Sequence, residues 1–237
     1  MKRIFPALLS LFVIFSSCKK DDVPAPVNPI GGMPGFGTST AAFTGTNWQL
    51  PQGVVLKDSI RDAQWWTDIQ GGAPVPVAVQ RGLPGGLFKV CLFLENTTGQ
   101  AITIDFPEEI LLLSNTIETQ NGIIIELETI TIPAHSETVI IASVFCINLE
   151  RDVPELYTSG GNLQAFSFGP ATVPPGIKEI TNILRPKNIR YSDMFVNGMF
   201  DVTRLSQMMV VQTALWEVTD DEGLTAETKA ELQALDF

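Results

Sequence analysis

The chain has 237 residues, of which 45% are hydrophobic and 17% are charged, and its formal net charge is −11 at pH 7. This length suits one or two domains with a packed core. The acidic balance excludes a nucleic-acid-binding protein, because phosphate recognition needs a basic surface. One histidine and three cysteines provide few metal ligands, so we expect neither a metal site nor any other cofactor.

The first residues follow the order of a targeting segment. Lys2 and Arg3 precede a mostly apolar stretch at residues 4–15, and two serines then lead to Cys18. The stretch is too short to cross a bilayer, for which about 20 residues are needed. The pattern resembles a bacterial lipoprotein signal, which implies cleavage before Cys18 and acylation of that cysteine, for instance with palmitate. The alternatives are a short anchor helix or an ordinary secretory signal in which Cys18 has no role.

The segment after the cysteine indicates where the protein is displayed. Residues 19–22 (KKDD) resemble the export tag of lipoproteins from the Bacteroidetes group, which implies display on the outer face of the outer membrane. The following residues are uncharged and rich in proline and glycine, as in extended tethers. We therefore expect a signal peptide at residues 1–17 and a lipidated cysteine with its tether at residues 18–47. The membrane would be a partner through the lipid.

Residues 48–160 have the pattern of an antiparallel β domain. Apolar runs rich in isoleucine and valine recur about every ten residues, and turn-forming residues separate them. The clearest runs are residues 87–94 (LFKVCLFL), 101–106 (AITIDF), 109–114 (EILLLS), 122–132 (GIIIELETITI) and 137–149 (ETVIIASVFCINL). The pattern predicts a mainly β fold, an Ig-like antiparallel β-sandwich.

Residues 161–237 change from strand to helix periodicity, which predicts a loop and a helical segment packed on the sandwich. Helices are expected at residues 176–184, at residues 203–219 and after Thr225, a residue type that favours helix N-caps. The second of these helices would contact the sandwich through Leu205, Met209, Gln212 and Trp216.

Gln212 falls at the centre of the apolar face of that helix. A buried carboxamide needs hydrogen-bond partners, and leaving it unpaired costs about 1–3 kcal/mol. One interpretation is that Gln212 binds a neighbouring backbone and attaches the helix to the β domain. The other is chemical. The thiol of Cys146, on an apolar strand, could attack the carboxamide, expel ammonia and leave an internal thioester shielded from water.

The residues around both positions resemble a known family. Residues 211–216 (VQTALW) resemble the Gln-x-Ala-aliphatic-Trp signature of the thioester domains of Gram-positive surface adhesins, and residues 145–148 (FCIN) resemble their cysteine segment. The resemblance implies Cys146 as the thioester sulfur, Gln212 as the acyl donor and Trp216 as part of the shield. The chain departs from those adhesins in its lipoprotein-type N-terminus and in the short separation between Cys146 and Gln212.

Two further states of Cys146 stay open at this point. Cys91 and Cys146 both lie on predicted strands, and cell-surface proteins commonly hold disulfides between the sheets of a sandwich. Both thiols could also be free core residues, because unpaired cysteine is often buried. A disulfide and a thioester cannot share the sulfur of Cys146.

The sequence contains none of the motifs of a common hydrolase, a phosphate-binding loop or a zinc enzyme, so we expect no enzymatic activity. The expected function is a non-enzymatic binding or adhesion module at the cell surface, with a surface protein or a glycan as its ligand. The alternative is a structural or accessory component of a surface assembly without covalent chemistry.

Overall fold

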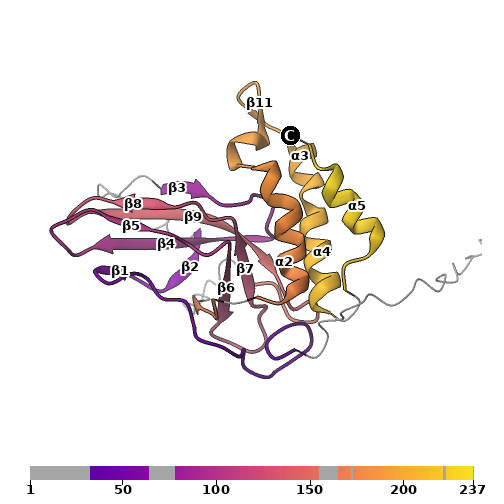
Figure 1. Ribbon diagram of the computed structural model, residues 1–237, viewed down its shortest axis with the longest axis horizontal. Coiled ribbons are helices and arrows are strands. Elements are labelled where there is room, and N and C mark those ends of the chain that lie inside the picture. Colours follow the sequence, from indigo (N-terminus) through magenta and orange to yellow (C-terminus); the bar gives the residue numbers. More distant parts are fainter. Residues whose placement is uncertain (1–32, 64–77, 155–164, 172, 221–222, 237) are drawn as a thin grey trace, which may run out of the picture.

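The computed structural model describes residues 33–63, 78–154, 165–171, 173–220 and 223–236 (Figure 1). The expected signal peptide and Cys18 lie outside the described residues.

Strands dominate the first two thirds of the described chain, and helices follow. The strands are β1 (Val54–Leu56), β2 (Ile60–Asp62), β3 (Ala78–Arg81), β4 (Phe88–Asn96), β5 (Ile102–Ile104), β6 (Glu109–Ser114), β7 (Gly122–Ile125), β8 (Ile130–Ile132), β9 (Glu137–Cys146), β10 (Ala165–Phe168), β11 (Phe195–Val196) and β12 (Met199–Phe200). The helices are α2 (Pro175–Leu184), α3 (Val202–Gln207), α4 (Met209–Thr219) and α5 (Ala226–Ala234), with 3₁₀ turns η1 (Arg185–Lys187) and η2 (Tyr191–Met194).

The β domain is a closed six-stranded antiparallel barrel, so the predicted Ig-like sandwich is wrong. Hydrogen-bonded neighbours run in the order β4-β2-β10-β6-β7-β9, and β9 pairs again with β4, which closes the ring. Strands β1 and β3 extend it, β3 being parallel to β9. A sandwich would leave two sheets with free edges, whereas here each of the six strands has a hydrogen-bonded neighbour on both sides.

Closure depends on the two longest strands. β4 and β9 pair from Phe88 opposite Val144 to Glu95 opposite Glu137, and β9 continues past the end of β4 to pair with β7 at Phe145 and Cys146. Because β4 also pairs with β2, these two strands join the two halves of the sheet into one ring.

Alternate side chains of β9 serve two apolar cores. Ile140, Ala142, Val144 and Cys146 point into the barrel core, the buried cluster that they form with residues such as Val90, Leu92, Ile110 and Ile124. Phe145, together with Ile147 just after the strand, belongs to the helix–barrel core, the cluster between the barrel and the helices. The period-two alternation of a strand explains why β9 is buried on both faces.

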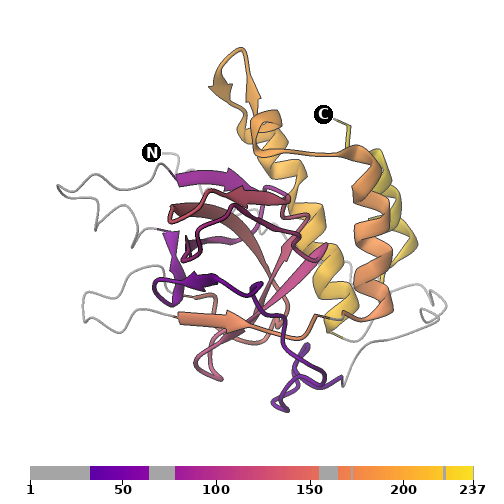
Figure 2. The ribbon, with the colours of Figure 1, turned by 60° about the vertical axis from the view of Figure 1, so that its left-hand side comes forward.

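The helices pack together at one side of the barrel, where α2, α4 and α5 each contact the other two and α4 contacts β9 (Figures 1 and 2). α2 and α5 confirm the predicted helices, and the Oγ1 atom of Thr225 caps α5 by accepting from the Thr228 amide. The helix predicted at residues 203–219 is interrupted at Met208, which ends α3 and precedes α4. Met209, predicted to be in the contact, is 40% exposed, whereas Met208 is buried. The buried face of α4 passes through Val211, Leu215 and Val218, and Met209 lies on the opposite side of the helix.

The β fold extends beyond both ends of the range predicted for it. Phe36, within the predicted tether, is 4% exposed, and the Gly37 amide donates to the Ile147 carbonyl. β10 is a barrel strand inside the segment expected to be loop and helix. None of the helices in the described part of the chain has the length and apolar character that a bilayer crossing requires.

A hairpin stands out from the helical end of the molecule (Figures 1 and 2). β11 and β12 pair around Asn197 and Gly198, both of which have left-handed backbone conformations. Apolar side chains of this hairpin and of the start of α3 face solvent, and Met199 and Val202 are 72% and 70% exposed.

Candidate functional site

The carboxamide of Gln212 lies against the backbone of Cys146. Its Oε1 atom accepts a hydrogen bond from the Cys146 amide at 2.8 Å, and its Nε2 atom donates to the Cys146 carbonyl oxygen, also at 2.8 Å. Both residues are completely buried. The structure therefore brings the two predicted residues together, and the polar groups of Gln212 have partners.

Gln212 occupies a place on β9 that β4 leaves open. The backbone groups of successive strand residues face opposite edges, and the Ile147 amide donates to Asn121 on the β7 side. The amide and carbonyl groups of Cys146 therefore face the other edge of β9. On that edge β4 begins only at Phe88, which lies opposite Val144, so β4 does not reach Cys146. Without Gln212 this buried donor and acceptor would have no strand partner. A carboxamide offers both complementary groups, as a paired strand residue does.

The backbone before β4 explains why the place is open. Gly86, which would oppose Cys146 if β4 continued, passes so close to β9 that a Cβ atom there would lie 2.4 Å from the Val144 carbonyl oxygen. Only glycine permits such an approach. The chain before β4 thus leaves the line of the strand, and the side chain of Gln212 on α4 completes the hydrogen bonding of β9.

Helix α4 is held against the barrel along its length. Val211, Ala214, Leu215 and Val218 are buried in the helix–barrel core. Gln212 lies beside them at the edge of the buried face, next to Thr219, so the packing of these apolar residues also buries the carboxamide. The sequence prediction that Gln212 is buried on the inward face of this helix is confirmed, although it lies at the edge of the buried face and not at its centre.

The side chain of Cys146 belongs to the barrel core, on the inward face of β9. Burial raises the pKa of this thiol from 9.0 to about 12, because the charged thiolate loses its hydration. The sulfur is therefore a protonated thiol at neutral pH, and a reaction at sulfur has to move that proton.

The structure does not bring Cys91 and Cys146 together, and both thiols are free. Cys91 lies opposite Ile141, which precedes Cys146 on β9 by five residues, or about 16 Å at the usual strand rise. Disulfides need Cα atoms within about 7 Å of each other. Cys91 also packs with Val139 and Ile141, away from the barrel core.

Trp216 follows Gln212 by one helical turn on α4 and packs, partly buried, against the barrel core that contains Cys146. Its indole Nε1 atom is buried and has no hydrogen-bond acceptor within the described part of the chain. Tryptophan is a donor only, and buried donors without a partner are rare in folded proteins. The resemblance to the adhesin domains implied a shielding role for this ring and gave no sign of an unpaired donor.

Two asparagines next to the site were missed at the sequence level. Asn148 Nδ2 donates to the carbonyl oxygens of Gly35 and Gly37, at 3.0 and 2.8 Å, and its Oδ1 atom accepts from the Asn121 amide at 2.9 Å. Both asparagines are buried. A polar residue inside the otherwise apolar end of the predicted strand at residues 137–149 was the available signal, because a buried carboxamide is almost always hydrogen-bonded.

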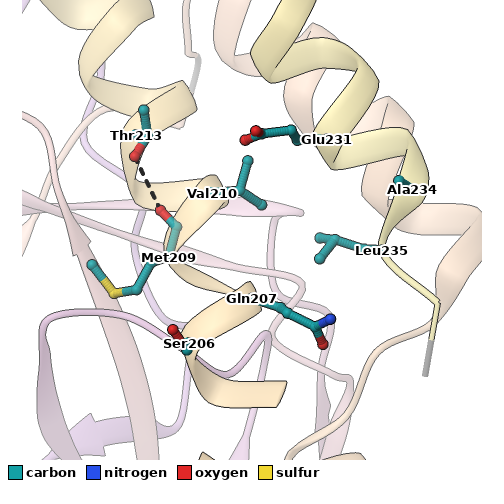
Figure 3. Close-up of a pocket in the computed structure, with 8 residues that line it drawn as sticks. All are labelled: Ser206, Gln207, Met209, Val210, Thr213, Glu231, Ala234 and Leu235. Carbon is teal, nitrogen blue, oxygen red and sulfur yellow. Dashed lines mark hydrogen bonds between the residues drawn. The ribbon is translucent and has the colours of Figure 1, made fainter. Parts of the chain in front are cut away.

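A groove of about 400 Å³ lies between α3, α4 and α5, on a different face of α4 from Gln212 (Figure 3). Thr213 lines it, with its hydroxyl donating to the Met209 carbonyl oxygen of the preceding turn at 3.3 Å, and Glu231 supplies its only carboxylate. Neither Cys146 nor Gln212 lines the groove, so their pair is a buried site separate from it.

Within the described ranges, no three histidine, cysteine, aspartate or glutamate residues are grouped so that they could hold a metal ion. The chemistry that the site can support therefore comes from the thiol of Cys146, the carboxamide of Gln212 and the donors around them. No protein-family model, curated protein or solved structure matches this chain.

Proposed function

We propose that the protein is a non-enzymatic adhesion module that is attached to the outer membrane by a lipid on Cys18 and carries an internal thioester between Cys146 and Gln212. The observation that carries the proposal is the pair of 2.8 Å hydrogen bonds that hold the Gln212 carboxamide against the Cys146 backbone, with both residues completely buried.

The bond would form by displacement of ammonia. The sulfur of Cys146 attacks the Cδ atom of Gln212, the bond between Cδ and Nε2 breaks, and the thiol proton leaves with the nitrogen as ammonia. The Cys146 amide already donates to Oε1 and therefore polarises the carbonyl that is attacked. Burial of both residues excludes the water that would hydrolyse the product.

The thioester is the group that would bind the partner covalently. An amine of a surface protein attacks the acyl carbon of residue 212, an amide forms, and the Cys146 thiol is released with the proton of the amine. A glycan hydroxyl would give an ester by the same route. The partner would have to reach the end of the barrel where α4 packs on β9.

An accessory component of a surface assembly is the second candidate function. It is supported by the exposed apolar hairpin, on which Met199 and the nearby Val202 are more than two thirds exposed. Apolar residues gathered on a projecting surface often mark protein contacts. In this function Gln212 only completes the hydrogen bonding of β9.

Intact-protein mass spectrometry separates the two functions. In the adhesion module, the wild-type domain is lighter than its sequence by one ammonia molecule, and methylamine adds to residue 212. Cys146→Ser should restore the full mass and abolish the addition, whereas Cys91→Ser, which changes the other buried thiol, should preserve both properties. A wild-type mass equal to the sequence, with two alkylatable thiols after unfolding, rejects the thioester and leaves the accessory function.

The lipid anchor has its own test. Growth of a bacterial host with a labelled fatty acid should label the full chain and should not label Cys18→Ala. Protease added to intact cells should then remove the domain from the labelled protein if it is displayed outward. Labelling that persists in Cys18→Ala excludes the proposed anchor.

A further inference from the structure

We propose that the indole Nε1–H of Trp216 is a hydrogen-bond donor to the acyl oxygen of residue 212 when the thioester forms and when it is opened. This inference rests on the proposed function. It assigns a role to the buried donor of Trp216, which has no acceptor among the residues that the structure describes.

The position of Trp216 follows from the helix. Residues four apart lie on the same face of an α-helix, and long helical side chains lean toward the N-terminus, over the preceding turn. Trp216 therefore lies over the turn that carries Gln212. Trp216 also packs against the barrel core, the cluster to which Cys146 belongs. Gln212 contacts Cys146 directly through its two hydrogen bonds.

The unreacted carboxamide explains why the donor is free. Gln212 Oε1 accepts from the Cys146 amide, and no hydrogen bond joins it to Trp216. When sulfur adds to Cδ, the planar carbonyl becomes tetrahedral and its oxygen gains negative charge. A donor directed at the oxygen in that intermediate stabilises it more than it stabilises the carboxamide, which is the condition for a faster reaction.

The Cys146 amide and the Trp216 indole would then form a two-donor oxyanion site. The intermediate collapses with loss of ammonia during formation, and an equivalent intermediate loses the thiol when an amine opens the bond. The same donor therefore acts in both directions. If the ring only shielded the thioester, a change at Trp216 would have the opposite effect. The amine would reach the acyl carbon more easily, and the thioester would open faster.

The experiment measures the rate at which methylamine opens the thioester, followed by intact mass, in wild type and in Trp216→Phe. The phenylalanine retains an aromatic ring and removes the N–H group. We expect opening to slow by roughly 100- to 1,000-fold, in line with the loss of one oxyanion donor elsewhere. Trp48→Phe is the matched control, because Trp48 also packs on the barrel core but contacts Phe106 and Phe168, and its rate should equal that of wild type.

An unchanged or faster rate in Trp216→Phe overturns the inference and leaves the thioester in place. A wild-type chain without a thioester overturns both the inference and the proposed function. A folded Trp216→Phe protein whose mass equals that of its sequence has not lost ammonia and has therefore not formed the thioester, which supports the donor role in formation. If that variant does not fold, benzothienylalanine at position 216 keeps the shape of the indole and replaces N–H by sulfur, and the same slowing is expected.

Discussion

Gln212 binds Cys146 as a neighbouring strand residue would, with one donor and one acceptor from a single side chain. In the unreacted chain this arrangement has a structural consequence. The Cys146 amide and carbonyl are buried at an edge that β4 does not reach, so the side chain of a helix completes the barrel. The helical layer and the barrel are therefore joined by polar contacts as well as by apolar packing.

Removal of the Gln212 carboxamide should destabilise the fold. Gln212→Ala leaves the buried amide and carbonyl of Cys146 without partners, and we expect the free energy of unfolding to fall by about 3 kcal/mol. Urea unfolding of the Cys146→Ala background, in which no thioester can form, measures the structural part alone. Gln207→Ala, at an exposed position of α3, is the control and should change stability little. Equal stabilities of the two variants would show that the hydrogen bonds from Gln212 to the Cys146 backbone do not stabilise the fold.

The buried thiols make the protein sensitive to alkaline pH. Burial raises the pKa of Cys91 and of Cys146 from 9.0 to about 12 each, and the carboxylate of Asp58 adds to the shift of Cys91. Above pH 9 the unfolded chain loses these protons while the folded chain keeps them. Stability should therefore fall between pH 9 and pH 12, by about 1.4 kcal/mol per pH unit for each free thiol.

The alkaline slope also reports the state of Cys146. Urea unfolding from about pH 8 to about pH 11 should give the steepest loss for a chain with two free thiols. Cys91→Ala should remove one contribution, and a chain with a thioester should show only the contribution of Cys91. Identical slopes for wild type and the Cys91→Ala/Cys146→Ala double variant would show that the thiols do not couple folding to pH.

Helix α2 depends on one hydroxyl that reaches a buried carboxylate. Thr181 Oγ1 donates to Glu109 Oε1 at 2.6 Å, and Lys178 binds the other oxygen of Glu109. Thr181→Val keeps the shape and removes the donor, so we expect a loss of about 2 kcal/mol in unfolding free energy. Thr213→Val changes an exposed threonine of α4 and should have little effect. A Thr181→Val protein as stable as Thr213→Val would show that Lys178 alone satisfies Glu109.

The sequence pattern predicted the local elements better than their pairing. Periodicity located α2, α5 and the burial of Gln212, because each depends on residues close in the chain. Barrel closure depends on β4 pairing with both β2 and β9, and the short β2 gives little periodic signal. Strands of a sandwich and of a barrel alternate in the same way, so the pattern could not separate the two folds.

The site was predictable in part for the same reason. Helix periodicity placed Gln212 toward the β domain, and the strand pattern placed Cys146 in the core. The partner of the carboxamide is a backbone edge that exists because Gly86 diverts the chain before β4. That diversion, and the unpaired Nε1 atom of Trp216, are properties of the assembled structure and leave no mark in local periodicity.

Asn148 should determine whether residues 33–47 stay on the barrel. Its carboxamide binds the carbonyl oxygens of Gly35 and Gly37 and accepts from the Asn121 amide, and all three contacts end in Asn148→Ala. We expect this variant to be cleaved by a protease within residues 33–47 at least ten-fold faster than wild type, because an opening cost lowered by about 1.4 kcal/mol raises the open population ten-fold. Asn182→Ala, at an exposed position of α2, controls for general effects and should be cleaved at the wild-type rate. Equal cleavage of the two variants, at matched overall stability, would mean that the packing of Phe36 is enough to hold the segment.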